Sequence, residues 1–445
     1  MRRAINSFIK SLIKIAVRLG FTWPLVFIYT KVIKEVSPLV KCDKGNNKKN
    51  TILALNPDRF RDDLEILADE FRVLRMPFYW QCKILCLYWP ENLFKKISIS
   101  RYCVPSGERS LKKIQEGLRS FLRMFLKDLY KRLSIDCVIG AAVYYKQDYD
   151  WGLVSDEVGV PYIVIHREGL CAAKKTKEEV IDKVSAIKAF KGSHIIVQNQ
   201  IMKDLLIQSN IVNSNRVSAS GCLRMDDFVN RIRDFKKKSK KRKKVVLFSF
   251  LYGIGSFIIP SNFNSHDEGF VGLFEHVHVS IARLAMENKE VDFIIKPKWG
   301  GQWLQTIEYH LNNNNIDSKS IKNLQIITDI NPHDLILEAD VVCAFSSTTL
   351  LEAAITGIPV IVPYYDEALN PEYSDYVLLK DDFDIFDVAH NIEEFEELII
   401  ERLKKVDIPP GCMERRREVF EKYVSTLEGN AKEKYIELIN RVIEG

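Results

Sequence analysis

One stretch near the C-terminal end, residues 340–363, constrains the fold of this chain more than any other. Residues 341–345 form an apolar run rich in β-branched side chains, which predicts a strand buried in a parallel sheet. Hydroxyl side chains follow, and residues 350–356 then predict a helix that ends at Gly357. A second apolar run at residues 360–362 predicts another strand. The turn after the first strand therefore lies at its carboxyl end, where open α/β sheets bind ligands.

This turn has the chemistry of an anion site. It contains Ser346, Ser347, Thr348 and Thr349, and backbone N–H groups at the start of a helix attract anions. Glu352 lies within the first two turns of the helix, where a carboxylate accepts hydrogen bonds from a diol such as a ribose. The alternative is that the hydroxyls only cap a helix and that Glu352 lies on its solvated face.

The segment resembles the donor-nucleotide element of GT-B glycosyltransferases. In that family a small-residue loop, a helix with Glu-Ala and a Gly-x-Pro-Val turn follow a strand. Here these pieces are residues 346–349, 352–353 and 357–360. The resemblance implies that the loop binds the diphosphate of a nucleotide donor and that Glu352 binds its ribose.

The remaining chain predicts further strands and helices in alternation, and 445 residues suffice for two or three domains. Alternation of this kind is typical of parallel sheets with helices on both faces. The expected strands are 51–55, 137–140, 161–166, 194–197, 245–250, 291–295 and 324–328. The expected helices include 64–71, 110–133, 151–158, 178–188, 202–209, 274–286, 332–339 and 392–404. The expected fold class is α/β, with two Rossmann-like doubly wound domains that face a cleft.

The chain divides by composition into five parts. We expect an amphipathic segment at 1–40, an acceptor domain at 41–230, a basic linker at 231–244, a donor domain at 245–405 and C-terminal helices at 406–445. The net charge is +6, yet residues 1–40 carry +6 and residues 231–244 carry +9, so the remainder is acidic. The basic character is therefore local.

The N-terminal segment predicts a helix with apolar residues on one face and Arg3, Lys10, Lys14 and Arg18 on the other. Residues 19–30 are apolar, but this run is shorter than the roughly 20 residues that cross a bilayer. We expect peripheral attachment to an anionic membrane at its cytoplasmic face, as for a bacterial inner membrane. The alternative is that the helix docks onto the protein's own domain.

Two other classes of interaction are not expected. The basic linker contains Phe235 as its one aromatic residue, whereas proteins that bind single-stranded nucleic acids stack bases on several aromatic side chains. The nine cysteines are scattered without a Cys-x-x-Cys pair, which indicates a reducing compartment and no zinc site.

His166, Arg167 and Glu168 end an expected strand of the first domain, just before Gly169. The Glu-Gly pair after an apolar strand is similar to bacterial surface-carbohydrate and capsule-type transferases. We expect Glu168 to act as the general base on the acceptor hydroxyl, with Asp156 and then His166 as alternatives. Arg167 is a candidate acceptor-binding residue.

Two further motifs carry the resemblance. Residues 221–226 are similar to the Gly-x-x-Arg-x-Asp that ends the first domain in these transferases, with Leu223 in place of a frequent proline. Arg224 and Asp226 are expected to pair across the cleft. Lys296 and Lys298 follow the strand at residues 291–295 and suit phosphate binding, although the resembling enzymes often carry histidine at the position of Lys298.

From about residue 50 to 430 the order of elements resembles a GT-B glycosyltransferase of the bacterial capsule or lipopolysaccharide kind. The resemblance implies a nucleotide-sugar donor and a glycan or lipid-linked acceptor. Many retaining members carry a second Glu eight residues before the nucleotide Glu, but Ala344 stands there, so we expect inversion. Asp382 and Asp384 form an Asp-x-Asp in form only, so we expect no metal and no cofactor.

Three alternatives to a glycosyltransferase stay open. A CDP-polyol phosphotransferase of the teichoic-acid type and a nucleotide-sugar 2-epimerase share the fold. A non-enzymatic membrane scaffold is the third.

Overall fold

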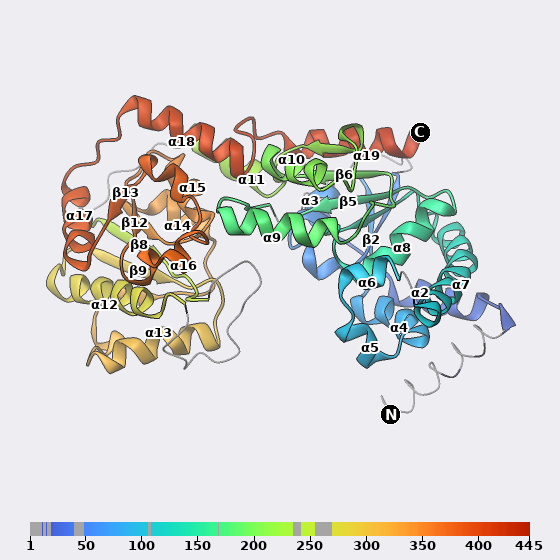
Figure 1. The fold of residues 1–445 in the computed structure, drawn as a ribbon. Coiled ribbons are helices and arrows are strands. Elements are labelled where there is room, and N and C mark those ends of the chain that lie inside the picture. The colour runs from blue at the N-terminus through green and yellow to red at the C-terminus, as the bar shows by residue number, and fades with distance from the viewer. Residues whose placement is uncertain are drawn as a thin grey trace. The chain divides into compact units, whose positions relative to one another are not determined.

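The computed structural model describes residues 11, 15, 19–39, 49–105, 108–167, 169–234, 242–253 and 269–445. The chain separates into two compact units, whose elements are labelled in Figure 1. Unit 1 contains residues 1–169, 180–226 and 428–445, and unit 2 contains residues 170–179 and 227–427. The sequence-based domain boundary at residue 230 falls inside helix α11 (Met225–Asp234), which is continuous through it.

Unit 1 is built on a seven-stranded sheet with the order β1-β3-β2-β4-β5-β6-β7. Its strands are β1 (Lys34–Glu35), β2 (Thr51–Ala54), β3 (Arg72–Arg75), β4 (Cys137–Gly140), β5 (Tyr162–His166), β6 (His194–Val197) and β7 (Val217–Ala219). All neighbouring pairs are parallel except β1 and β3, which are antiparallel. Since β2 pairs with both β3 and β4, the chain order reverses between β2 and β4.

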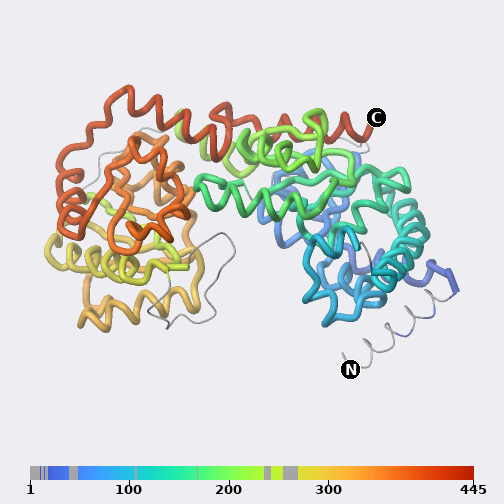
Figure 2. Tube along the Cα trace, viewed as in Figure 1, coloured from blue at the N-terminus to red at the C-terminus, as the bar shows by residue number. Residues whose placement is uncertain are grey.

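Helices cover both faces of this sheet. They are α2 (Trp23–Val32), α3 (Asp63–Leu67), α4 (Phe78–Tyr88), α5 (Glu91–Lys96), α6 (Ile99–Cys103), α7 (Arg109–Leu133), α8 (Lys146–Glu157), α9 (Lys174–Ser185), α10 (Gln200–Gln208) and α19 (Ala431–Glu444). Helix α19 packs beside α3 on one face, so the end of the chain lies against an early part of unit 1 (Figure 2). Its buried Tyr435 and Ile439 belong to the same core cluster as Ile52 and Ile139.

Helix α2 docks onto unit 1 through its inner face. Leu25 and Tyr29 are fully buried, and the Tyr29 hydroxyl donates a hydrogen bond of 2.7 Å to the carbonyl of Trp80. The Tyr29 ring also meets Phe125 of α7 edge to face. Helix α2 is therefore anchored on unit 1 by this inner face. The predicted basic face at Arg3, Lys10, Lys14 and Arg18 lies outside the described residues.

Unit 2 is built on a six-stranded parallel sheet with the order β10-β9-β8-β11-β12-β13. Its strands are β8 (Lys244–Phe248), β9 (Asp292–Lys296), β10 (Leu324–Ile326), β11 (Val341–Ala344), β12 (Val360–Pro363) and β13 (Asp387–Ala389). Its helices are α11, α12 (Val271–Glu287), α13 (Gln302–Asn313), α14 (Pro332–Glu338), α15 (Thr349–Ala354), α16 (Pro371–Ser374), α17 (Ile392–Lys404) and α18 (Pro410–Tyr423). The expectation of two parallel, doubly wound α/β sheets is confirmed.

Most predicted elements occur within a few residues of their expected bounds, and the differences have local causes. The helix expected at 64–71 ends at Leu67, because β3 begins at Arg72. Helix α8 begins at Lys146, before the expected start at residue 151. Helix α17 begins where its sequence indicates, since the Asn391 side chain accepts a hydrogen bond of 2.8 Å from the backbone N–H of Glu394.

A buried arginine joins α18 to the strand–turn–helix–strand unit. Arg416 is 1 % exposed, and its guanidinium donates to the carbonyls of Ala354 (3.3 Å), Ile358 (2.9 Å) and Ile385 (2.9 Å). Ala354 is the last residue of α15, so a positive charge lies where the helix dipole is negative. Burial lowers the pKa of Arg416, and the three carbonyls offset part of the lost hydration.

We expect Arg416→Met to lower the free energy of unfolding by about 3 kcal/mol, because three buried carbonyls lose their donors. Chemical denaturation followed by circular dichroism measures this change. Arg417→Met is the matched control, since Arg417 is the exposed neighbour on the same helix and its replacement should cost little. Equal stability of the two variants would contradict the role of Arg416.

Candidate functional site

The sheet of unit 2 has its topological switch point between β8 and β11. These two strands pair in parallel, with Val245 opposite Val341, and the other strands extend the sheet on either side. In open α/β sheets, ligands bind outside the carboxyl ends of the strands at this point. The residues that follow the two strands are Ser249 and residues 345–349, so the predicted turn lies at the switch point.

The four hydroxyl residues of the turn are half-buried. Ser346 adopts a left-handed backbone conformation (φ 48°), and its hydroxyl oxygen accepts a hydrogen bond of 3.3 Å from the backbone N–H of Leu378. Ser347 accepts hydrogen bonds from the backbone N–H (3.3 Å) and the hydroxyl (2.8 Å) of Thr349. The N-cap residue is Thr348, whose own side chain does not cap the helix. Ser346, Ser347 and Thr349 thus hold the turn together while remaining partly accessible.

Glu352 does not lie on a solvated face. Its side chain is buried, and one carboxylate oxygen lies 3.4 Å from Nε2 of His333 on α14. The His333 ring stacks on Phe228 of α11, with 4.1 Å between ring centroids and 14° between planes. This contact orients the imidazole toward the carboxylate.

His333 was not predicted as a site residue, although its neighbours signal its position. Asn331 accepts a hydrogen bond of 2.9 Å from the backbone N–H of His333, and Pro332 is the first residue of α14. An Asn-Pro start after a strand places the next side chain at the carboxyl edge of the sheet. Arg231 of α11 and Asp334 of α14 form an ion pair of 2.6 Å that holds the two helices together beside Glu352.

The two predicted lysines differ in their surroundings. Lys296 ends β9, and its ammonium donates hydrogen bonds of 2.8 Å to the carbonyls of Pro297 and Thr328. This ammonium therefore links the ends of two strands and does not extend into solvent. Burial lowers the pKa of Lys296. The Lys298 ammonium lies 4.8 Å from the centre of the Trp299 ring, and that ring is 54 % exposed.

A second helix also begins at this edge, and a carboxylate already occupies its N-terminus. Glu367 accepts hydrogen bonds from the backbone N–H groups of Gly272 (2.7 Å) and Leu273 (2.9 Å), which both lie in the first turn of α12. The sequence did not indicate this contact, because the partners are far apart in the chain. Negative charge is therefore already present at the start of α12.

A buried hydrogen-bond chain fixes the end of β8. Nδ1–H of His278 donates to the carbonyl of Phe274 (2.6 Å), which leaves Nε2 to accept from the Ser249 hydroxyl (2.8 Å). The Ser249 oxygen in turn accepts from Nε1–H of Trp303 (2.9 Å). Burial lowers the pKa of His278 to about 3, so the imidazole is neutral at physiological pH.

In unit 1 the switch point lies between β2 and β4, and a network not predicted from the sequence spans it. The side-chain amide of Gln81 donates to the Asp148 carboxylate (2.6 Å), while its oxygen accepts from the backbone N–H of Asn56 (3.1 Å). Asn56 has a left-handed backbone conformation (φ 49°) just after β2. Burial raises the pKa of Asp148 to about 7. The network fixes the edge where unit 1 is expected to bind a ligand.

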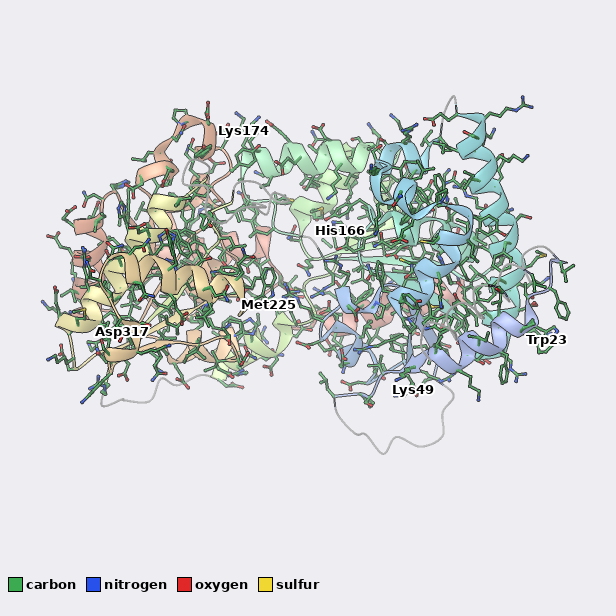
Figure 3. The ribbon with its side chains drawn as sticks, turned by 90° about the horizontal axis from the view of Figure 1, so that it is seen from below. Trp23, Lys49, His166, Lys174, Met225 and Asp317 are labelled. Carbon is green, nitrogen blue, oxygen red and sulfur yellow. The ribbon has the colours of Figure 1, made fainter. Side chains whose placement is uncertain are left out.

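The predicted residues after β5 are placed as follows. Glu168, the expected general base, lies outside the described residues. His166 is fully buried within the sheet region labelled in Figure 3, and its Nδ1 accepts a 3.4 Å hydrogen bond from the backbone N–H of Val143. Arg167 pairs with Asp63 of α3 at 2.6 Å. Burial raises the pKa of Asp63 and lowers that of Arg167, so desolvation opposes the charge on both partners.

Two other predicted residues have structural partners. Asp156 accepts a hydrogen bond from Ser193, which precedes β6, so it lies at the amino edge of the sheet. A helix between parallel strands runs back across the sheet, which places its last turn opposite the ligand edge; this position does not support a general base. Asp226 accepts hydrogen bonds from the backbone N–H groups of Ala431 (3.0 Å) and Lys432 (2.8 Å) and thereby caps α19. Arg224 contributes positive charge near Asp63 and Arg167.

Within the described part of the chain, no group of three or more His, Cys, Asp or Glu side chains gathers in a way that could hold an ion. Asp382, the first residue of the Asp-x-Asp, is buried and paired with Arg415 at 2.8 Å and with Lys422 at 3.6 Å. Two cations of α18 thus neutralise this carboxylate.

Comparisons with known proteins identify no family. No protein-family model and no curated protein matches the chain. The UDP-GlcNAc 2-epimerase of Neisseria meningitidis is 12 % identical, with a TM-score of 0.46 over 88 % of this chain and 99 % of that chain. A putative UDP-N-acetylglucosamine 2-epimerase of Listeria monocytogenes is 10 % identical, with a TM-score of 0.49 over 89 % and 97 %. The wall teichoic acid polymerase TagF is 11 % identical, with a TM-score of 0.47 over 99 % and 98 %.

The strand orders show two Rossmann-like α/β units with one sheet each, which is the fold class expected from the sequence. The likeness to the epimerases and to TagF does not extend to a shared activity.

We expect the stability of the protein to fall as the pH drops from 6.5 toward 3, because the unfolded chain protonates His278 while the folded chain does not. Above the ordinary pKa of histidine, the buried neutral imidazole has no effect on how stability changes with pH. Below that pKa, the free energy of unfolding falls by about 1.4 kcal/mol for each pH unit. Denaturant unfolding at pH 5 and pH 6.5 measures the slope. His278→Gln should lower this slope by the contribution of one proton. Trp303→Phe also breaks the hydrogen-bond chain but should keep the slope of the wild type. Equal slopes in these two variants would contradict the assignment.

Proposed function

We propose that the protein is a glycosyltransferase that moves a sugar from a nucleotide-activated donor to a glycan or lipid-linked acceptor of a bacterial surface polysaccharide. One observation carries the proposal: Glu352 is buried at the switch point of unit 2, beside the hydroxyl turn, with its carboxylate facing His333. A carboxylate held in place accepts hydrogen bonds from a ribose diol, and the adjoining hydroxyls donate to phosphate oxygens.

The surroundings of the turn favour it over α12 as the phosphate site. Glu367 already caps α12, so a diphosphate would meet a negative charge there. Ser346 and Thr348 lie at the other side of the switch point and are half-buried, so their hydroxyls can reach a ligand. In the proposal, the turn binds the diphosphate, and Lys298 with Trp299 contributes charge and stacking.

We propose a single displacement with inversion. A retaining enzyme of this kind would place a carboxylate eight residues before Glu352, but Ala344 stands there as a fully buried residue of β11. Inversion requires a base that takes the proton of the acceptor hydroxyl as the nucleotide leaves, and Glu168 at the carboxyl end of β5 is the proposed base. The reaction is proposed to need no metal, since Asp382 already has two cationic partners.

The proposed setting is the anionic face of a membrane, to which the protein binds peripherally at the cytoplasmic side. None of the described helices is both long and apolar enough to cross a bilayer. The support for peripheral binding is the run of six Lys/Arg and no Asp/Glu in residues 1–33.

Glu352→Ala should weaken nucleotide binding by about 1–3 kcal/mol, the loss of charge-assisted hydrogen bonds to a ribose. Thermal stabilisation by UDP, CDP, GDP and CMP identifies the nucleotide, because a bound ligand raises the unfolding temperature by mass action. Isothermal titration of that nucleotide then measures the loss.

Glu397→Ala, on the exposed side of α17, is the matched control and should bind normally. His333→Gln provides a second test, because it removes the partner of Glu352 and leaves the carboxylate in place. Unchanged affinity in both Glu352→Ala and His333→Gln would remove this region from the donor site.

Glu168→Gln should lower turnover about 10²–10⁴-fold with nucleotide affinity unchanged, because the amide keeps the size of the side chain but cannot accept the proton. Transfer of a radiolabelled sugar to membrane extract, measured with EDTA in the buffer, also tests the proposed metal independence. Glu157→Gln, which replaces an exposed surface partner of Arg123, should turn over normally. Normal turnover in Glu168→Gln would refute the base, and a 2-epimerised nucleotide sugar as the product would refute transfer.

A further inference from the structure

The exposed apolar side chains of unit 1 are concentrated on the N-terminal segment. Leu19 is 72 % exposed, Trp23 61 % and Phe27 55 %, and Ile15 is 54 % exposed as well. Gly20 adopts a left-handed backbone conformation (φ 62°) between Leu19 and α2, so only Trp23, Phe27 and Lys31 recur every fourth residue along that helix. We call Trp23, Phe27 and Lys31 the outer stripe. Trp23 lies at the periphery of unit 1 in Figure 3.

The outer stripe is displayed by a helix that is anchored on its opposite side. Trp23, Phe27 and Lys31 share one face of α2, whereas Leu25 and Tyr29 are fully buried against unit 1. The Lys31 ammonium lies 5.6 Å from the centre of the Phe27 ring, and Phe21 meets Trp23 edge to face at 5.7 Å. An inner face that is already docked leaves the apolar outer face without a role in the core.

The start of α4 adds aromatic residues beside α2. The Tyr29 ring packs edge to face on Trp80, and Trp80 packs in the same way on Tyr79, which is 54 % exposed. The ammonium of Lys83 lies 4.7 Å from the Tyr79 ring and 4.3 Å from the Trp80 ring. Aromatic residues next to lysine are typical of proteins at the membrane interface, where the rings lie at headgroup depth.

The positive charge of this surface favours anionic lipid over a second copy of the chain as its binding partner. Neither residues 19–33 nor α4 contains an Asp or Glu, while both contain lysine. A second copy of the chain would bring the exposed Lys31 of both copies into one twofold contact, where the two charges would repel. Anionic lipid headgroups instead complement Lys31, and the apolar layer beneath them accommodates the rings.

We propose that the outer stripe of α2, together with the start of α4, is a preformed docking surface for an anionic lipid bilayer. The inner face of α2 fixes the surface on unit 1, so binding does not require a disordered segment to fold. Trp23 and Phe27 enter the interface, and the exposed Lys31 contacts the phosphates. The proposal rests on the peripheral membrane binding proposed above and names its surface, but it does not depend on sugar transfer, because all its residues belong to unit 1 and the nucleotide residues to unit 2.

The test is co-sedimentation of the full-length protein with vesicles of phosphatidylcholine, with and without phosphatidylglycerol. We expect binding to the anionic vesicles that weakens in high salt. The double variant W23S/F27S should lower the partition coefficient at least about tenfold, because two aromatic side chains no longer enter the lipid. Its unfolding temperature and nucleotide affinity should stay close to those of the wild type, since both side chains are more than half exposed.

M286S/Y309S is the matched control, because it removes two exposed apolar side chains from unit 2 and should leave vesicle binding intact. Unchanged vesicle binding by W23S/F27S would overturn the proposal. So would equal binding to neutral and anionic vesicles, which would show that charge does not select the lipid. A wild-type dimer in gel filtration that W23S/F27S abolishes, without any vesicle binding, would assign the surface to a second copy instead.

Discussion

Both sheets are buried on both faces, and this constraint decides where chemistry is possible. Every residue of β2, β4, β11 and β12 is buried, and nearly all of them are apolar. Polar groups are costly inside such a layer, so they gather where strands end and the backbone leaves the sheet. Ser249, Ser346 and Lys296 lie at strand ends in unit 2, and Asn56 and Arg167 lie at strand ends in unit 1.

The sequence predicted these strands well because the burial of each strand is encoded in its own consecutive residues. A run of four or five apolar residues followed by a hydroxyl or a glycine specifies a buried strand and its end, as at residues 341–346. Glu352 was found in the same way, since its distance from the strand end is fixed along one helix. His333 and Asp148 were missed, because their partners Glu352 and Gln81 lie far away in the sequence. A single sequence does not indicate which distant side chains meet.

A position close to the end of an element in the sequence did not by itself predict the role of a residue. Asp156 and Asp226 have suitable chemistry, but one lies at the amino edge of the sheet and the other caps α19. The direction of the helix decides the first case, and a helix 205 residues further along the chain decides the second. Arg416 shows the same dependence, since a residue of α18 satisfies the carbonyls at the end of α15.

The two helices that begin at the switch point of unit 2 differ in the charge at their N-termini, and this difference bears on specificity. Glu367 supplies an internal anion to α12 through two backbone hydrogen bonds. The turn before α15 is held by hydroxyl groups, which are neutral and both donate and accept hydrogen bonds. In the proposed function, a phosphate at this turn would meet hydroxyl donors, while the Glu352 carboxylate in the first turn of α15 faces His333. The proposed diphosphate and ribose sites would then adjoin one another at the start of α15.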